Sequence, residues 1–189
     1  MKIEINPTWT LFLDRDGVIN KDIEGSYVLS VDQFEFLPNV LPAFAKFNDL
    51  FMQVIVVTNQ RCIGRGLLKE EELEAIHEHM LRAIIKAGGK IDKIYYAPVD
   101  DIAHNLRKPN IGMALQAQLD YPNIDLTKSI MIGNSISDMQ FGKKTGMTTI
   151  YITKKIYDPH EKVYIDYEVT NLEEAVELMT TINDKTLEN

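Results

Sequence analysis

Residues 11–20 read LFLDRDGVIN, and the rest of the chain is best interpreted outward from this stretch. The apolar run LFL at 11–13 predicts a buried strand, and DRDG at 14–17 predicts that this strand ends by placing charged groups at a sheet edge. Two carboxylates so close together resist joint ionisation, so the pair favours a bound cation or a proton on one member. The stretch therefore indicates an acidic, metal-assisted site, with a solvated turn after a strand as the alternative.

The composition is that of an ordinary globular chain of 189 residues, 45% of them hydrophobic and 25% charged. A formal net charge of −8 argues against a nucleic-acid or anionic membrane surface but permits a local basic pocket. The single cysteine, Cys62, excludes an internal disulfide and a zinc site built on paired thiolates. With no signal-like segment and no long apolar run, we expect a cytoplasmic protein that forms one domain over 1–189, with a polar tail at 183–189.

Hydrophobic periodicity predicts strands that alternate with helices along the chain. Strands are expected at 11–13, 54–57, 91–96, 129–132, 148–152 and 168–169, and helices at 40–51, 69–86, 111–119 and 172–182, with one more after the turn at 133–138. Residues 61–68, which include two glycines, are expected to form a loop. This alternation predicts an α/β fold with a doubly wound, mostly parallel sheet and helices on both of its faces.

Polar residues follow four of the predicted strands, where a parallel sheet brings its ligand-binding edge together. They are Asp14 and Asp16, then Thr58 and Asn59, then Lys108, and finally Asn134 and Asp138. Such a set suits phosphoryl transfer, because one carboxylate can attack phosphorus and a second can act as acid and base. A hydroxyl, an amide, an ammonium group and Mg²⁺ can neutralise the phosphoryl oxygens. By contrast, His77 and His79 lie two residues apart on a predicted helix and point in different directions, so we interpret them as ordinary helix residues.

These motifs resemble those of the haloacid dehalogenase superfamily of phosphatases with an aspartate nucleophile. DRDG at 14–17 resembles its DxD motif, Thr58 its Ser/Thr, Lys108 its lysine, and GNSISD at 133–138 its GDxxxD motif. FLDRDGVIN at 12–20, VTNQ at 57–60, IGRG at 63–66 and RKP at 107–109 are similar to the group of heptose-1,7-bisphosphate 7-phosphatases and histidinol phosphatases. Segments 25–28 and 34–37 also resemble the heptose enzymes, and the resemblance covers residues 8–155.

The resemblance implies a Rossmann-like fold with only short cap loops and a Mg²⁺-dependent phosphomonoester hydrolase that works through an aspartyl phosphate. It implies the following roles: Asp14 as nucleophile, Asp16 as general acid and base, Thr58 and Lys108 as phosphoryl-binding catalytic residues, Asn59, Gln60, Arg107, Arg65, Asp22 and Tyr27 as substrate-binding residues, and Asp14, Asp16, Asn134 and Asp138 as the Mg²⁺ site. The implied partner is a small phosphorylated metabolite, D-glycero-D-manno-heptose 1,7-bisphosphate or a similar sugar phosphate. We expect a monomer that binds neither nucleic acid nor membrane.

Three departures from the family pattern affect these expectations. The usual zinc-loop ligands are replaced by Ala97, Val99, His104 and Leu106, so we expect no structural zinc. TNQSG of the family is TNQRC here, which places Arg61 and Cys62 beside the phosphate loop and leaves substrate choice open. Asn134 stands where the family carries a metal-binding aspartate, and the lost charge should weaken Mg²⁺ binding. Histidinol phosphate as substrate and a non-catalytic phosphometabolite-binding protein are the alternatives.

Overall fold

A computed structural model describes residues 5–153 and 157–187 of the chain, with side chains described as far as residue 179. The strands are β1 (Thr10–Leu13), β2 (Gln53–Asn59), β3 (Lys93–Ala97), β4 (Ser129–Gly133), β5 (Thr148–Ile152) and β6 (Tyr167–Val169). The α-helices are α1 (Val40–Leu50), α2 (Arg61–Gly64), α3 (Glu70–Lys86), α4 (Gly112–Asp120), α5 (Ile136–Lys144) and α6 (Leu172–Leu187). Short 3₁₀ helices are η1 (Val31–Gln33), η2 (Leu126–Lys128) and η3 (Pro159–Tyr164).

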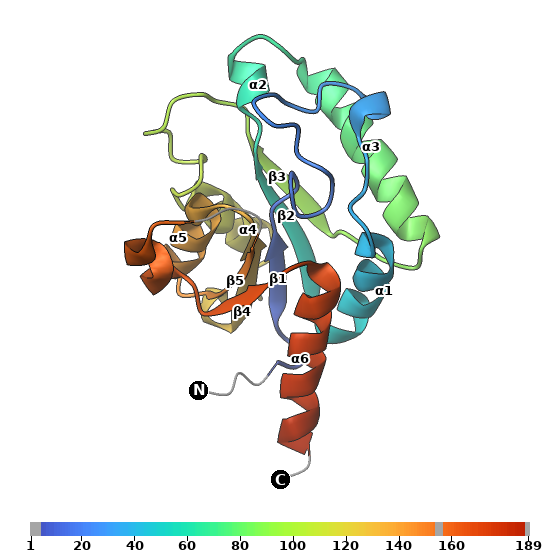
Figure 1. Cartoon of the computed structure of the whole chain (residues 1–189), viewed down its shortest axis with the longest axis vertical. Coiled ribbons are helices and arrows are strands. Elements are labelled where there is room, and N and C mark those ends of the chain that lie inside the picture. Colours follow the sequence, from blue (N-terminus) through green and yellow to red (C-terminus); the bar gives the residue numbers. More distant parts are fainter. Residues whose placement is uncertain (1–4, 154–156, 188–189) are drawn as a thin grey trace.

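The strands form one parallel sheet in the order β3-β2-β1-β4-β5-β6, which confirms the predicted α/β architecture (Figure 1). β1 lies in the middle, where Leu11 is in register with Val54 of β2 on one side and with Ile130 of β4 on the other. The chain first builds outward from β1 to β3 and then returns to add β4 beside β1. The order therefore reverses between β1 and β4, and the carboxyl ends of these strands border the expected ligand crevice.

The predicted strands and helices end within two residues of the observed bounds, with two exceptions. Residues 61–68 were expected to be a loop, but Arg61–Gly64 forms the single-turn helix α2, which is too short to show a hydrophobic period. Helix α6 was expected to end at residue 182 and instead continues to Leu187, so most of the predicted polar tail is helical. Residues 188 and 189 of that tail lie outside the described residues. A polar helical segment without an end signal gives no pattern by which its last turn can be located.

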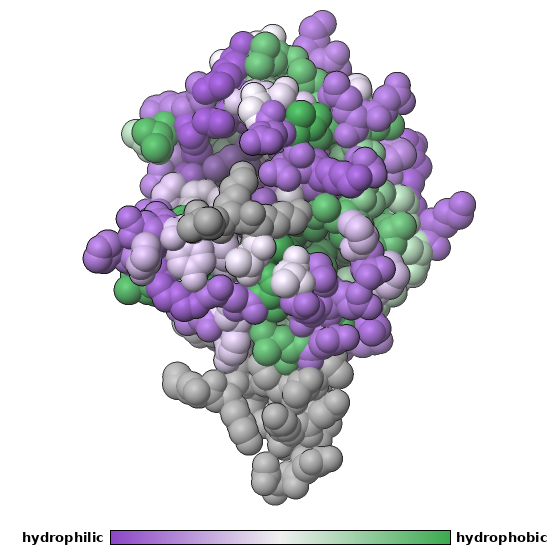
Figure 2. Space-filling view, viewed as in Figure 1, coloured by the Kyte–Doolittle hydropathy of each residue, from purple (hydrophilic) through white to green (hydrophobic). Residues whose placement is uncertain are grey.

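The segment between β1 and α1 has little regular structure. Its regular structure is η1 together with isolated bridges from Asp16 to Asn20 and from Asn20 to Phe36, so the cap over the strand ends is a short loop. The side of the molecule seen in Figure 2 is mostly hydrophilic, with smaller hydrophobic patches among the polar residues. No helix in the described parts of the chain has both the length and the apolar character needed to cross a bilayer.

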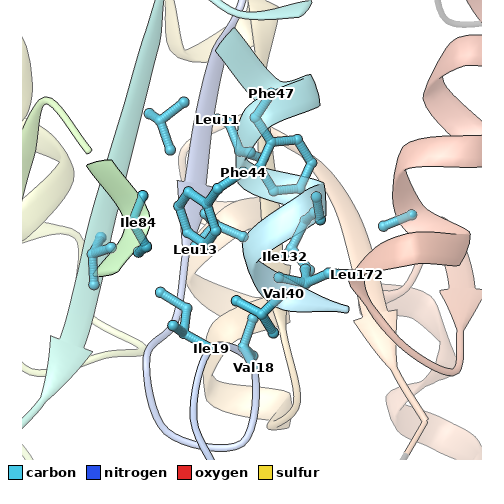
Figure 3. Close-up of a cluster of buried hydrophobic side chains, with 14 of the residues drawn as sticks. Leu11, Leu13, Val18, Ile19, Val40, Phe44, Phe47, Ile84, Ile132 and Leu172 are labelled. Carbon is cyan, nitrogen blue, oxygen red and sulfur yellow. The ribbon is translucent and has the colours of Figure 1, made fainter. Parts of the chain in front are cut away.

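The core has two layers, because successive side chains of each strand point to opposite faces of the sheet. Leu11 and Leu13 of β1 pack in one cluster with α1, α3 and α6, as the labelled side chains of Figure 3 show. Phe12 points to the other face and packs in a second cluster with α4 and α5. Both faces of β1 are fully buried, so the strand is fixed in position, and its carboxyl end carries the DRDG loop.

Candidate active site

A buried lysine connects the ends of the central strands. Lys108 follows β3, is 2% exposed, and its Nζ lies 3.0 Å from Asp14 Oδ1 and 2.7 Å from Asp138 Oδ1. The same ammonium group donates a hydrogen bond of 2.6 Å to the backbone carbonyl of Val57 in β2. Asp14 itself is held beside β4 by a hydrogen bond of 3.0 Å from its backbone N–H to the carbonyl of Ile132. The expected meeting of strand ends is therefore present as a chain of ion pairs.

Burial and neighbouring charges shift the pKa values of Asp14 and Lys108. Burial, together with the charges of Asp138 and Asp16, raises the pKa of Asp14 to about 7, although Lys108 opposes the shift. Burial by itself would lower the pKa of Lys108, but Asp138 and Asp14 outweigh it and raise that pKa, so the lysine stays protonated. One ammonium group is shared by two carboxylates. The site consequently holds more negative charge than Lys108 can neutralise.

Asp16 faces a different set of partners from Asp14. The guanidinium of Arg15 binds it through Nε at 3.2 Å and Nη2 at 3.0 Å, while Asn20 Nδ2 and Gln60 Nε2 each donate a hydrogen bond of 2.9 Å. Burial alone would raise the pKa of Asp16, but Arg15 and the hydrogen bonds from Asn20 and Gln60 lower it. The two acidic groups of the DRDG loop thus have pKa values shifted in opposite directions.

The interaction that fixes Arg15 was not expected from the sequence. Arg15 is fully buried, and its Nη1 lies 3.1 Å from Nε2 of His77 on α3. Burial and the neighbouring Arg15 charge lower the pKa of His77 to about 3, so the imidazole is neutral and its Nε2 accepts the hydrogen bond. His77 is therefore a buried acceptor for the arginine that holds Asp16. His79, two residues further on, packs its ring against Phe34 instead.

The polar residues at the end of β2, Thr58 and Asn59, and Gln60 after it form hydrogen bonds with other protein groups. Gln60 Nε2 donates to Thr58 Oγ1 at 2.9 Å as well as to Asp16, so it joins these two predicted catalytic residues. Asn59 holds the backbone of Lys108, accepting its N–H at 2.9 Å and donating to its carbonyl at 3.1 Å. Asn59 and Gln60 were expected to bind substrate directly. In the structure their amides set the positions of Thr58, Asp16 and Lys108.

Asn134 and Asp138 complete the site from the side of β4. The side chain of Asn134 is packed against Gly17, where an added Cβ would lie only 2.0 Å from its Nδ2. Gly17 also has a φ of +78°, so both its backbone and its close contact require glycine. Asp138 is fully buried, and its Oδ2 accepts hydrogen bonds from the N–H of Ser135 at 3.0 Å and its Oγ at 2.7 Å. Asp138 therefore caps α5 and pairs with Lys108 at the same time.

The donors at these strand ends fit a hard cation. Asp14, Asp138 and Asn134 offer carboxylate and amide oxygens, the ligands that Mg²⁺ prefers, and the raised pKa of Asp14 reflects its burial and the charges of Asp138 and Asp16. Within residues 5–153 and 157–179 no cluster of three or more His, Cys, Asp or Glu side chains is arranged as a metal site. A cation here would depend on the Asn134 amide and on backbone carbonyls in addition to the carboxylates.

The remaining predicted substrate residues lie at the rim of the site. A cavity of about 650 Å³ is lined by Asp22, Ile23, Glu24, Gly25, Ser26, Tyr27, Arg61 and Arg65. The guanidinium carbons of Arg61 and Arg65 each lie 5.9 Å from the centre of the Tyr27 ring. Arg107, beside Lys108 in the chain, is 3.7 Å from Asp100, which also pairs with Arg65. The structure thus separates an inner group of acidic and lysine side chains from an outer group rich in arginine.

Comparisons with known proteins agree with this geometry. A family model described as HAD-hydrolase-like matches residues 105–175. The chain is 36% identical over 148 residues to D-glycero-alpha-D-manno-heptose-1,7-bisphosphate 7-phosphatase of Campylobacter jejuni, covering 78% of this chain and 84% of the relative. It is 33% identical over 172 residues to the D-glycero-beta-D-manno-heptose-1,7-bisphosphate 7-phosphatase of Escherichia coli K12, covering 86% and 88%.

A solved structure shows the same similarity in three dimensions. The D,D-heptose 1,7-bisphosphate phosphatase of B. bronchiseptica, complexed with magnesium and phosphate, superposes with a TM-score of 0.79 at 28% identity, covering 92% of this chain and 98% of that one. The chain belongs to the HAD-like hydrolase family and is a phosphatase of that family. Phosphatases of this family generally use Mg²⁺.

The contact between His77 and Arg15 can be tested by stability. His77→Leu removes the acceptor of a buried guanidinium N–H, and we expect the free energy of unfolding to fall by about 1–3 kcal/mol. His77→Gln keeps an acceptor of similar reach and should retain most of that stability, whereas His79→Leu controls for the same change on α3. Urea unfolding of the three variants gives the comparison. Equal losses for His77→Leu and His77→Gln would show that ring packing, and not the hydrogen bond, matters.

The raised pKa of Asp14 predicts a pH-dependent stability in metal-free protein. Between the ordinary value of 3.8 and about 7 the folded state keeps a proton that the unfolded state loses, so stability falls as pH rises. Asp14→Asn removes the ionisable group. With EDTA present, we expect this variant to melt roughly 5 °C or more above the wild type at pH 8, with a smaller difference at pH 5. A difference that is independent of pH would contradict the assigned pKa.

Proposed function

We propose that this phosphatase hydrolyses the 7-phosphate of D-glycero-D-manno-heptose 1,7-bisphosphate through a phosphorylated Asp14. The observation that carries the proposal is the buried Asp14–Lys108–Asp138 chain at the switch point of the sheet, beside a cavity lined by arginines. The names of the relatives support the substrate, although they differ in the anomer, alpha for the Campylobacter relative and beta for the Escherichia relative.

In the proposed reaction a carboxylate oxygen of Asp14 attacks phosphorus, and the bond to the sugar oxygen breaks as the aspartyl phosphate forms. Asp16 gives its proton to the leaving sugar oxygen. Asp16 then takes a proton from water, the water oxygen attacks phosphorus, and the bond to Asp14 breaks to release phosphate. Lys108 and the hydroxyl of Thr58 bind the oxygens of the transferring group and stabilise the charge on them.

The hydrogen bonds of Asp16 suit its proposed role in the second step of the reaction, the hydrolysis of the aspartyl phosphate. Arg15, Asn20 and Gln60 lower its pKa, so Asp16 is ionised in the free protein, as a general base must be. To act first as an acid it must take up a proton. A bound phosphoryl dianion beside the carboxylate raises the pKa, because like charges disfavour ionisation, and we propose that substrate binding supplies this shift.

Mg²⁺ would be held by the Asp14 carboxylate, the Asp16 backbone carbonyl and the Asn134 amide oxygen, and it would supply positive charge to the phosphoryl oxygens. Asp138 has both carboxylate oxygens engaged, by Lys108 and by Ser135, so we assign it to indirect support of the cation. The side chain of Asn134 lies against Gly17, which follows Asp16 in the DRDG loop.

The outer group would hold the part of the substrate that does not react. Arg107 and Arg65 suit a second phosphate, since guanidinium forks match phosphate oxygens, while Tyr27 and Asp22 line the cavity that the sugar would enter. Arg107 Nε is buried without a hydrogen-bond partner among the described residues, a donor that an anion could satisfy. We further propose that the protein is a cytoplasmic monomer. We also propose that it has no structural zinc, since the Nδ1 of His104, the one potential ligand at the four zinc-loop positions before Lys108, accepts a hydrogen bond from the N–H of Leu106.

Removing the nucleophile tests the proposed reaction. We expect Asp14→Asn to lower phosphate release by more than about a thousandfold while the protein remains folded, because an amide cannot form the acyl phosphate. The assay compares alpha and beta heptose bisphosphates with histidinol phosphate under saturating Mg²⁺. Activity of Asp14→Asn within tenfold of the wild type would exclude Asp14 as the nucleophile, and turnover of histidinol phosphate alone would overturn the substrate.

Restoring the carboxylate at position 134 tests the metal site. We expect Asn134→Asp to lower the Mg²⁺ concentration for half-maximal activity by about tenfold, because a formal charge at contact distance strengthens a hard-cation site. Calorimetric Mg²⁺ binding to both proteins gives a readout that is independent of turnover. An inactive wild type beside an active Asn134→Asp would favour the non-catalytic binding protein. No change in either measurement would place Asn134 outside the metal shell.

A further inference from the structure

Three arginines converge on one carboxylate at the rim of the candidate active site. Arg65 forms a two-pronged contact with Asp100, from Nε to Oδ2 at 2.8 Å and from Nη2 to Oδ1 at 3.0 Å. Arg61 and Arg107 approach the same carboxylate at 3.8 and 3.7 Å. Arg107 also donates a hydrogen bond to the backbone carbonyl of Asp100. We call Asp100 and these three residues the arginine cluster.

The backbone around Asp100 is held in place by close packing. An added Cβ at Gly64 of α2 would lie 2.9 Å from the carbonyl oxygen of Pro98 and 3.0 Å from the N–H nitrogen of Asp100. Only a residue without a side chain allows α2 and residues 98–100 to come this close. The position of Asp100 is therefore set by the contact of two backbones and does not depend on its ion pairs.

The arginines likewise have contacts that do not involve the carboxylate. Arg61 and Arg65 stack near the Tyr27 ring, each with its guanidinium carbon 5.9 Å from the ring centre. Arg107 is bound by the backbone carbonyl of Asp100, which any residue at this position would retain. Loss of the Asp100 carboxylate would thus leave the three guanidinium groups near their present positions, with one negative charge fewer among them.

The contact between Arg65 and Asp100 has the geometry by which arginine binds a phosphate. The cluster also borders the reaction site, since Arg107 precedes Lys108 and Arg61 follows Gln60, which binds Asp16. The hydrogen bond from Arg65 lowers the pKa of Asp100, so the carboxylate is ionised and competes as an anion. Its side chain is 39% exposed, and ion pairs at such exposure are weak enough to exchange with a ligand.

We propose that Asp100 is a specificity-determining residue whose carboxylate occupies the arginine cluster and must be displaced by the second phosphate of a bisphosphate substrate. The proposal rests on the proposed function, in which Arg107 and Arg65 hold the non-reacting phosphate. A monophosphate has no group that needs this site, so Asp100 leaves its binding unaffected. The Asp100 carboxylate therefore lowers the preference of the enzyme for a bisphosphate over the matching monophosphate.

The test compares Asp100→Asn with the matched variant Asp101→Asn. Asp101 lies in the same exposed loop and accepts a hydrogen bond of 2.9 Å from the N–H of Ala103, and the described ion pairs of Arg61, Arg65 and Arg107 are with Asp100. Both variants lose one negative charge, while Asp22 and Glu24 stay in the cavity. The substrates are D-glycero-D-manno-heptose 1,7-bisphosphate and the 7-phosphate of the same sugar, which share the reacting phosphate. The readout is the ratio of kcat/KM for the bisphosphate to that for the monophosphate.

We expect the ratio to rise about three- to tenfold in Asp100→Asn, mainly through a lower KM for the bisphosphate, and to stay within about twofold of the wild type in Asp101→Asn. An unchanged ratio in Asp100→Asn overturns the proposal, and a lower ratio shows that the carboxylate orders the arginines and does not compete with phosphate. An equal rise in both variants assigns the effect to net charge and also overturns the proposal.

The wild-type activities separate a failure of this inference from a failure of the proposed function. If the wild type hydrolyses the monophosphate and the ratio is insensitive to Asp100, the inference fails alone. If the wild type hydrolyses neither sugar phosphate, the proposed function fails and the inference with it.

Discussion

The site depends on one buried ammonium group, that of Lys108, placed between Asp14 and Asp138. Without it, two carboxylates would be buried close together with no counter-ion, an arrangement that costs several kcal/mol in protein interiors. The ion pairs also hold three separate segments together, because their members come from the end of β1, the segment after β3 and the start of α5. The hydrogen bonds between Asn59 and the Lys108 backbone and between Ser135 and Asp138 hold the middle and one end of this series of ion pairs. Lys108 is therefore as much part of the fold as of the site.

A second network surrounds the other carboxylate of the same loop. Asp16 is bound by Arg15, Asn20 and Gln60, and Arg15 is in turn bound by His77. The pKa of Asp14 is raised to about 7 and that of Asp16 is lowered, although the two residues are separated by one position in the chain. Such divergence of paired titratable groups is how a protein assigns different roles to chemically identical side chains. Here the divergence arises because burial and the neighbouring carboxylates outweigh Lys108 at Asp14, whereas Arg15 and the hydrogen bonds from Asn20 and Gln60 outweigh burial at Asp16.

The outer part of the site is built on a different principle. The cap is a short loop, so no folded domain closes over the strand ends, and the cavity beside Tyr27 remains accessible to small molecules. The guanidinium groups of Arg61 and Arg65 there are exposed, and ion pairs of exposed groups are individually weak and sensitive to salt. Lys108 and Asp138 of the inner site are buried, whereas the ion pair between Arg65 and Asp100 in the outer site is exposed. This division allows substrate preference to change through loop residues while the chemistry at the strand ends is kept.

The sequence by itself predicted the alternation of strands and helices, the mostly parallel sheet and the grouping of Asp14, Asp16, Thr58, Lys108, Asn134 and Asp138 at one edge of that sheet. It could do so because hydrophobic periodicity locates strands and parallel topology brings their carboxyl ends together. Only the tertiary structure decided that Asn59 and Gln60 bind protein groups, that His77 accepts a hydrogen bond from Arg15, and that Asp100 lies among three arginines. The direction of a polar side chain depends on partners brought close by folding, such as His77, 62 residues from Arg15, and local sequence carries no signal for such pairs.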